Sequence, residues 1–143
     1  MSTVERAIQL AATAHAGQVD KAGQPYILHP LRVMLRVEKP EERIAAVLHD
    51  VVEDTEVTLD DLANEGFSQH VIEAVETLTK KPGEDRLEAA ARAARNKIAR
   101  AVKLEDNAEN MDLTRIQDST EKDRARLEEY KAVLALLLAT NAV

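Results

Sequence analysis

Apolar residues recur three or four positions apart along most of the chain, which is the spacing of amphipathic helices. This spacing predicts a first helix over residues 3–16, with Thr3 as its N-cap and Gly17 just after its end. Residues 19–25 include a glycine and a proline and are predicted to form a loop. A short helix with Pro30 in its first turn is expected to follow that loop.

Pro40 interrupts the pattern, and the acidic pair after it suits the start of a longer helix that runs through residues 44–52 and to about Asp54. Further helical segments are expected over 58–66, 68–81, 84–104 and from about residue 119 or 120 to 139. No strand, repeat or interdomain linker is predicted. The pattern therefore favours an all-α fold and a single domain over residues 1–143.

Composition narrows the functional classes. The net charge is −7, and no basic stripe with interleaved aromatic residues is present, so no nucleic-acid partner is expected. The chain has no cysteine, which excludes disulfides and thiolate metal sites. The longest apolar run, Ala132–Ala139, is much shorter than the roughly 20 residues that span a bilayer. With no leader pattern at the N-terminus, a cytoplasmic protein without membrane association is expected; the oligomeric state stays open.

The segment Leu48–Thr55 (LHDVVEDT) holds the most informative polar residues. On a helix, His49 and Glu53 lie one turn apart on one face, and so do Asp50 and Asp54. Imidazole and carboxylate groups together can bind a divalent cation, and neighbouring carboxylates can position or deprotonate a metal-bound water. A chain with 26 acidic residues could also place a solvated acidic helix end here, and this alternative remains open.

Four further segments accompany this one: AHAGQ (14–18), GQPYILHP (23–30), LTK (78–80) and VKLED (102–106). In this order, over about residues 7–115, they resemble the RelA/SpoT-type family of HD-domain (ppGpp) hydrolases. The resemblance implies an all-α HD-domain helical bundle with a metal site in a central cleft. The cleft is expected between the His49 helix, the Asp106 helix and the loop before His29.

The resemblance also implies roles for individual residues. It implies Mn²⁺, or another divalent cation, held by His29, His49, Asp50 and Asp106. It assigns Glu53 and Asp54 to orienting and activating the attacking water, Asn110 to contacting the nucleotide, and Lys21 to the substrate phosphate. The implied partner is a small nucleotide. The implied reaction is hydrolysis of the 3′-pyrophosphate of ppGpp-type alarmones to GDP and pyrophosphate, by a stand-alone hydrolase without a synthetase domain.

Three positions depart from that family's usual pattern. Asp20 stands where an arginine commonly stacks on guanine, Glu105 replaces a usual alanine, and Asn107 replaces a frequent arginine. Exchanging arginine for aspartate removes a cationic stacking plane and adds an anion near a polyphosphate. Two alternatives therefore stay open: an HD hydrolase acting on another nucleotide or pyrophosphate compound, or a catalytically quiet nucleotide-binding protein.

Other polar residues are expected to have structural roles. His15 is predicted to be a hydrogen-bonded structural histidine, and Tyr26 either lines the pocket or packs beneath the loop. The remaining polar residues singled out are predicted to be solvent-exposed: Arg92, Arg95 and Arg100 on one helix face, and Glu105 and Glu109 beside Asp106.

Overall fold

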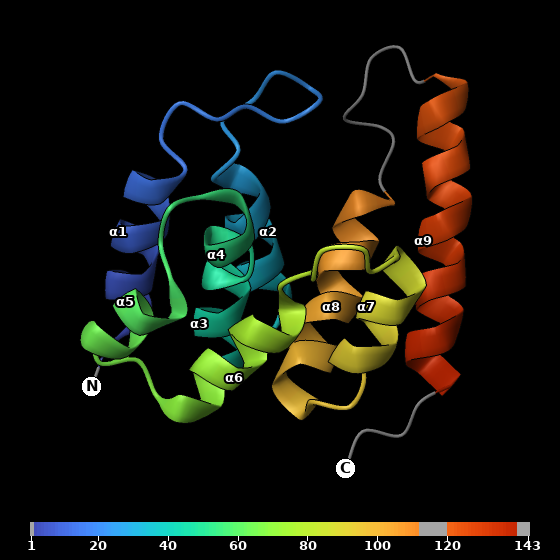
Figure 1. Cartoon of the computed structure of the whole chain (residues 1–143). Coiled ribbons are helices and arrows are strands. Elements are labelled where there is room, and N and C mark those ends of the chain that lie inside the picture. The colour runs from blue at the N-terminus through green and yellow to red at the C-terminus, as the bar shows by residue number, and fades with distance from the viewer. Residues whose placement is uncertain (1, 112–119, 140–143) are drawn as a thin grey trace.

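The structure, a computed structural model, describes residues 2–111 and 120–139. Within these residues the chain is helical, and its β-type pairing is limited to one isolated bridge between Val19 and Pro25. The all-α prediction is therefore confirmed. The helices, shown in Figure 1, are α1 (Val4–Ala14), α2 (Leu28–Arg36), α3 (Pro40–Leu48), α4 (Val51–Asp54), α5 (Leu59–Asn64), α6 (Gln69–Leu78), α7 (Arg86–Ala93), α8 (Lys97–Asn110) and α9 (Glu121–Ala139).

Several helix boundaries follow from local capping. The Thr3 side chain accepts a hydrogen bond from the Arg6 N–H, and Thr58 forms a capping box with Asp61 at the start of α5. The backbone after α1 turns at Gly17, where φ is 87°, a conformation that a side chain would disfavour. The predicted Ser119 start of the last helix lies outside the described residues; α9 begins just after Thr120.

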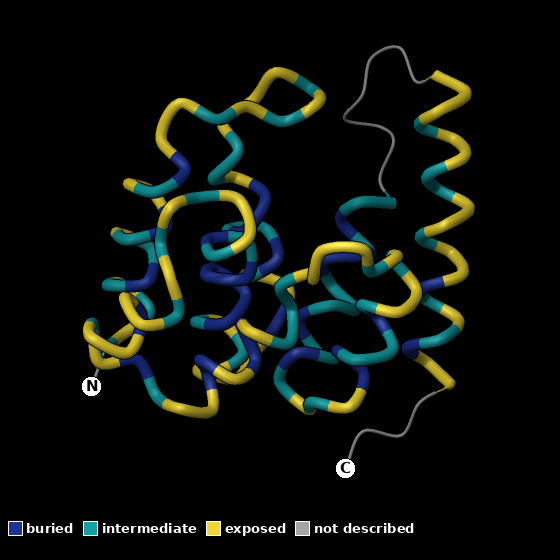
Figure 2. The backbone as a smooth tube through the Cα atoms, viewed as in Figure 1, coloured by how far each residue is buried: buried dark blue, intermediate teal, exposed yellow. Residues whose placement is uncertain are grey.

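Helix α3 lies at the centre of the fold and contacts α1, α2, α6 and α8 (Figure 1). Its side chains at positions 45–48 are fully buried, as the dark segment in Figure 2 shows. Val47 and Leu48 belong to the core formed with α1, α5 and α6, whereas Ala45 and Ala46 belong to the core with α2 and α8. This burial fixes the end of α3, and therefore the position of His49, in the middle of the molecule.

The predicted single helix from residue 41 to 54 is wrong in one respect. Helix α3 ends at Leu48, His49 and Asp50 form a turn, and α4 starts at Val51. The carbonyl of Ala46 contacts the His49 Nδ1 at 2.5 Å and accepts a hydrogen bond from the His49 N–H at 3.5 Å. That carbonyl would otherwise serve Asp50 in a continuous α-helix, so the His49 side chain competes with the helical ladder.

Helix α9 packs along α7 and α8 at one side of the fold (Figure 1). Val133 and Leu137 are fully buried against Ala90 and Ala94. The Asn107 side chain of α8 donates a hydrogen bond to the Tyr130 carbonyl at 2.9 Å. Asn107, one of the three departures from the usual family pattern, therefore anchors α9. Among the described residues, no helix combines the length and apolar character that crossing a membrane requires.

Candidate metal centre and active-site cleft

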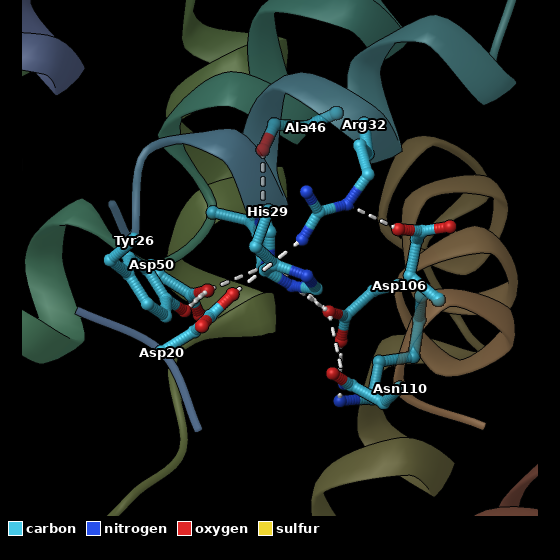
Figure 3. A network of polar contacts seen from close by, with 11 residues as sticks. Asp20, Tyr26, His29, Arg32, Ala46, Asp50, Asp106 and Asn110 are labelled. Atoms are coloured by element: carbon cyan, nitrogen blue, oxygen red, sulfur yellow. Dashed lines mark hydrogen bonds and ion pairs between the residues drawn. The ribbon is translucent and has the colours of Figure 1, made fainter. Parts of the chain in front are cut away.

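The structure brings together the side chains of four residues that the sequence analysis selected as metal ligands. His29 lies in the first turn of α2, His49 and Asp50 form the α3–α4 turn, and Asp106 lies in α8. The Asp106 Oδ1 is 2.8 Å from the His29 Nε2 and 3.3 Å from the His49 Nε2. The His49 Nε2 is also 3.0 Å from the Asp50 Oδ2. Figure 3 shows the side chains of His29, Asp50 and Asp106 converging from separate parts of the fold.

His49 has the orientation of a metal-binding imidazole. Its Nδ1 faces the Ala46 carbonyl, which can only accept, so in the neutral ring Nδ1 carries the proton and Nε2 keeps its lone pair. The Nε2 atom is buried and has no partner with hydrogen-bond geometry, despite the carboxylates nearby. A buried polar atom without a hydrogen bond is costly, and a cation at this point would complete its coordination.

The surroundings of His49 and Asp106 shift the pKa values of both side chains strongly. Burial alone would lower the pKa of His49, but the carboxylates of Asp50 and Asp106 hold it well above its usual value. Burial would raise the pKa of Asp106, yet Lys103, His49 and His29 keep it well below its usual range. Metal binding needs neutral imidazoles and ionised carboxylates, so a divalent cation would take the place of a proton on His49. Two imidazoles and two carboxylates are a donor set that suits Mn²⁺ or a similar divalent ion, so these residues fit the metal.

Tyr26 supports the cluster from the loop before α2. Its hydroxyl donates a hydrogen bond to the Asp50 Oδ2, and its ring lies 5.8 Å from the His29 ring, centroid to centroid. Burial, together with the Asp50 carboxylate, raises the pKa of Tyr26, so the hydroxyl stays a donor. Of the two expectations for Tyr26, lining the pocket is correct. His15 is buried, and its Nδ1 lies 2.8 Å from the Gln18 Oε1, which confirms a structural histidine.

Glu53 and Asp54 lie on α4 beside Asp50, where one oxygen from each of the three carboxylates falls within 4.8 Å of the others. Burial, with the Asp50 and Glu53 charges, raises the pKa of Asp54 to about 6. The Glu53 Oε1 accepts a hydrogen bond from the Lys80 backbone N–H at 2.7 Å. The two neighbours therefore differ: Asp54 can exchange a proton near neutrality, whereas Glu53 holds the loop after α6.

A cavity of about 420 Å³ opens beside these carboxylates. Lys21 and Asn110 line it, and their role as substrate contacts stays a prediction. The Asn110 Nδ2 donates to the Asp106 Oδ1 at 3.4 Å, and the Lys21 Nζ lies at the rim, 3.1 Å from the Asp123 Oδ1. The cavity wall also includes α7 and α9, which the sequence analysis did not place there. Its further polar lining residues are Asp20, Arg86, Lys103, Asp123, Arg126 and Tyr130.

Sequence reasoning missed the cations of this wall. Lys103 precedes Asp106 by three residues, a helical spacing that could have indicated it, and its Nζ is 3.4 Å from the Asp106 Oδ2. Arg86 and Arg126 carry no such signal, because only tertiary packing turns α7 and α9 toward the cleft. The guanidinium of Arg86 lies 4.6 Å from the centre of the Tyr130 ring.

Three expectations of solvent exposure are wrong. Arg92 binds both Glu84 oxygens and donates to the carbonyls of Glu76, Thr77 and Thr79. Arg100 donates to the Leu137 carbonyl. Glu109 is buried between two arginines of α2. In each case a neighbouring helix covers the face that the sequence pattern left polar. Arg95 is exposed as expected, and Glu105 is half-buried beside Arg36.

Asp20 does not project a free carboxylate into the cleft. Its Oδ1 accepts hydrogen bonds from the Ala22 and Gln24 backbone N–H groups, at 2.9 and 3.0 Å. Its Oδ2 is buried and lies 3.9 Å from the Arg32 Nη2. Asp20 therefore shapes the loop that carries Lys21.

Comparison with known proteins agrees with this arrangement. Residues 7–140 match the HD domain family. A GTP pyrophosphokinase of Streptomyces coelicolor is 36% identical over 156 aligned positions, covering 98% of this chain and 18% of that protein. A guanosine-3′,5′-bis(diphosphate) 3′-pyrophosphohydrolase of Aquifex aeolicus is 41% identical over 81 residues, covering 54% of this chain and 12% of that protein. The chain thus spans less than a fifth of the length of either relative.

A solved structure shares the fold. It was described with the words "A metazoan ortholog of SpoT hydrolyzes ppGpp and plays a role in starvation responses". The TM-score is 0.79 at 24% sequence identity, and the match covers 99% of this chain and 89% of that one.

Proposed function

The chain belongs to the HD domain family, and on this premise we propose that it is a metal-dependent phosphohydrolase of guanosine 3′-pyrophosphate nucleotides. The products would be GDP and pyrophosphate, formed within one domain over residues 1–143. The Aquifex aeolicus relative, whose name states this reaction, supports the choice of substrate. The proposed cation is Mn²⁺, with another divalent ion as the alternative.

One observation carries the proposal: the buried His49 Nε2 without a hydrogen bond, surrounded by carboxylates and a second imidazole. Three distant parts of the chain contribute to this point, and a cavity with both carboxylates and cations opens beside it. The alternative of a solvated acidic helix end over residues 48–55 fits the exposed Glu53 and Asp54, but it does not account for His49 or for the distant Asp106 that meets it. Both are buried.

In the proposed mechanism His29, His49, Asp50 and Asp106 hold the cation, which supplies Lewis acidity at the phosphoryl group when bound. Asp54 takes a proton from the attacking water, because its raised pKa suits proton transfer near neutral pH. The water oxygen bonds to phosphorus as the bond from phosphorus to the ribose 3′ oxygen breaks, and that oxygen is protonated in GDP.

The other cleft residues would bind and orient the substrate. Glu53 fixes the loop at Lys80, and Lys21 would leave Asp123 to contact a substrate phosphate. Asn110, at the end of the Asp106 helix, would contact the nucleotide. Together with Lys103 these residues line the cavity that would receive the phosphoryl group.

A second candidate function is the same metal-dependent hydrolysis acting on a substrate without guanine. Asp20 is engaged within its own loop and faces Arg32, so position 20 offers no cationic plane for guanine. Another nucleotide or pyrophosphate compound is the substrate in this case.

The test is turnover of purified protein with Mn²⁺ against ppGpp and a panel of other nucleotides. We expect pyrophosphate release from ppGpp, loss of activity on chelation, and loss in Asp106→Asn, which removes one carboxylate ligand. Preferential turnover of another panel member would select the second candidate. Stoichiometric Mn²⁺ binding without turnover of any panel member would refute hydrolysis and identify a binding protein.

A further inference from the structure

Glu109 is a buried acid between the two helices that carry His29 and Asp106. Its Oε1 accepts a hydrogen bond from the Arg32 Nε at 2.7 Å, and its Oε2 accepts one from the Arg36 Nη1 at 2.9 Å. Only 6% of the residue is exposed. A buried carboxylate destabilises a fold unless it is paired with a cation. The packing of α2 on α8 therefore depends on these two arginine contacts.

The Arg32–Glu109 pair lies one helical turn from the proposed metal ligands on both helices. Arg32 follows His29 by three residues on α2, and Glu109 follows Asp106 by three residues on α8. The His29 Nε2 and Asp106 Oδ1 are 2.8 Å apart, so two polar contacts join the same helices side by side. In Figure 3 the Arg32 guanidinium lies beside the His29 and Asp106 side chains.

Arg32 also reaches the loop that forms the cavity rim. Its Nη2 is buried, lies 3.9 Å from the Asp20 Oδ2, and has no hydrogen-bond partner among the described residues. Arg36, one turn further along α2, is more exposed and binds Glu105 and Glu109. Arg36 therefore offers a matched comparison, because it shares Glu109 but lies further from His29 along the helix.

We propose that Arg32 is a positioning residue, which through Glu109 holds His29 and Asp106 at the separation that a cation requires. The inference rests on the proposed function in taking these two side chains as ligands. Partners behind the ligands of a metal typically contribute about 10–100-fold to metal affinity, because they fix the ligands before the ion arrives. The Arg32–Glu109 pair would do so by fixing the helices.

The experiment is calorimetric titration of Mn²⁺ alone into the metal-free full chain, for the wild type, Arg32→Met, Arg32→Lys and Arg36→Met. We expect the Kd for Mn²⁺ to rise about 10–100-fold in Arg32→Met and to stay near the wild-type value in Arg36→Met. Arg32→Lys should lie between them, since an ammonium can still donate to Glu109. Thermal unfolding of each metal-free variant shows whether it is folded, and both Met variants should unfold at lower temperature.

Each outcome has a distinct meaning. Wild-type affinity in Arg32→Met, or an equal loss in Arg36→Met, would overturn the positioning role and leave the proposed function intact. Absence of Mn²⁺ binding by the wild type would instead overturn the proposed metal site, and this inference with it. Should Arg32→Met fail to fold, the near-isosteric Glu109→Gln decides, because its neutral amide binds Arg32 less strongly; unchanged Mn²⁺ affinity in that variant would refute the proposal.

Discussion

Asp54→Asn and Glu53→Gln should have different effects, although the two carboxylates are adjacent on α4. Asp54 is exposed, like Glu53, but it lies beside Asp50, and its pKa is raised to about 6, first by partial burial and then by the Asp50 and Glu53 charges. Glu53 is exposed and accepts the Lys80 N–H. Asp54 is therefore suited to accept a proton from water, whereas Glu53 holds a loop.

The expected magnitudes follow from these roles. An amide at position 54 cannot accept the proton, so Asp54→Asn should lower kcat about 10²–10⁴-fold, or about 3–5.5 kcal/mol in activation free energy. At position 53, a glutamine oxygen can still accept the Lys80 N–H. Glu53→Gln should therefore cost about tenfold or less, since the loop contact is retained in weaker form. Neither change removes a proposed metal ligand.

The assay is steady-state hydrolysis of ppGpp at saturating Mn²⁺, with the bound metal of each variant measured in parallel. Asp50→Asn serves as the control that should lose metal and be rescued in part by excess Mn²⁺. The reasoning is refuted if Asp54→Asn loses metal as readily as Asp50→Asn. It is refuted equally if Glu53→Gln loses as much kcat as Asp54→Asn, because the two carboxylates would then act together.

Two further predictions concern contacts outside the ligand set. Tyr26→Phe removes the hydroxyl that donates to Asp50 and should weaken Mn²⁺ binding about tenfold, measured by titration, while the protein remains folded; an unchanged Kd would contradict it. The Arg92 guanidinium lowers the pKa of Glu84 to about 2, so this pair stabilises the fold above the ordinary Glu84 pKa and ceases to do so as pH falls toward 2. The free energies of unfolding of wild type and Arg92→Met, measured with denaturant from pH 7 to pH 2, should therefore differ most at pH 7. The difference should shrink toward pH 2, where only the contacts of Arg92 with the carbonyls of residues 76, 77 and 79 still distinguish the two proteins. A difference that does not change with pH would refute the assignment.

Much of the fold was predictable because local signals sufficed. Helical spacing and caps such as Thr3 and Thr58 set most helices, and the resemblance to RelA/SpoT-type proteins is supported by the family match and the shared fold. The break at His49 was not predictable, since it depends on a side chain competing for the Ala46 carbonyl. Spacing alone placed His49 and Glu53 one turn apart on a single helix, whereas in the structure His49 lies in the turn before the helix that carries Glu53.

The candidate site, like the fold, was predictable from the sequence only in part. The motifs selected His29 and Asp106, which are 77 residues apart in the sequence, and the structure brings them within hydrogen-bond distance. Their role as ligands stays a prediction. The burial of Glu109 could not be anticipated, because a lone acid near a helix end is normally solvated and only the packing of α2 on α8 encloses it. Arg126 lines the cleft only because α9 packs against α7 and α8, which the sequence pattern did not indicate.

The charges of the cleft explain how an acidic chain could accept a polyanion. Among the described residues that line it are six acids (Asp20, Asp50, Glu53, Asp54, Asp106 and Asp123) and four cations (Lys21, Arg86, Lys103 and Arg126). With all of these ionised, the lining has an excess of two negative charges, which repels a polyphosphate. One divalent cation cancels that excess, and it does so beside the acidic wall while the lysines and arginines remain available to phosphate. On this argument metal binding precedes binding of the proposed substrate, because the ion removes the net repulsion between the cleft and a polyphosphate.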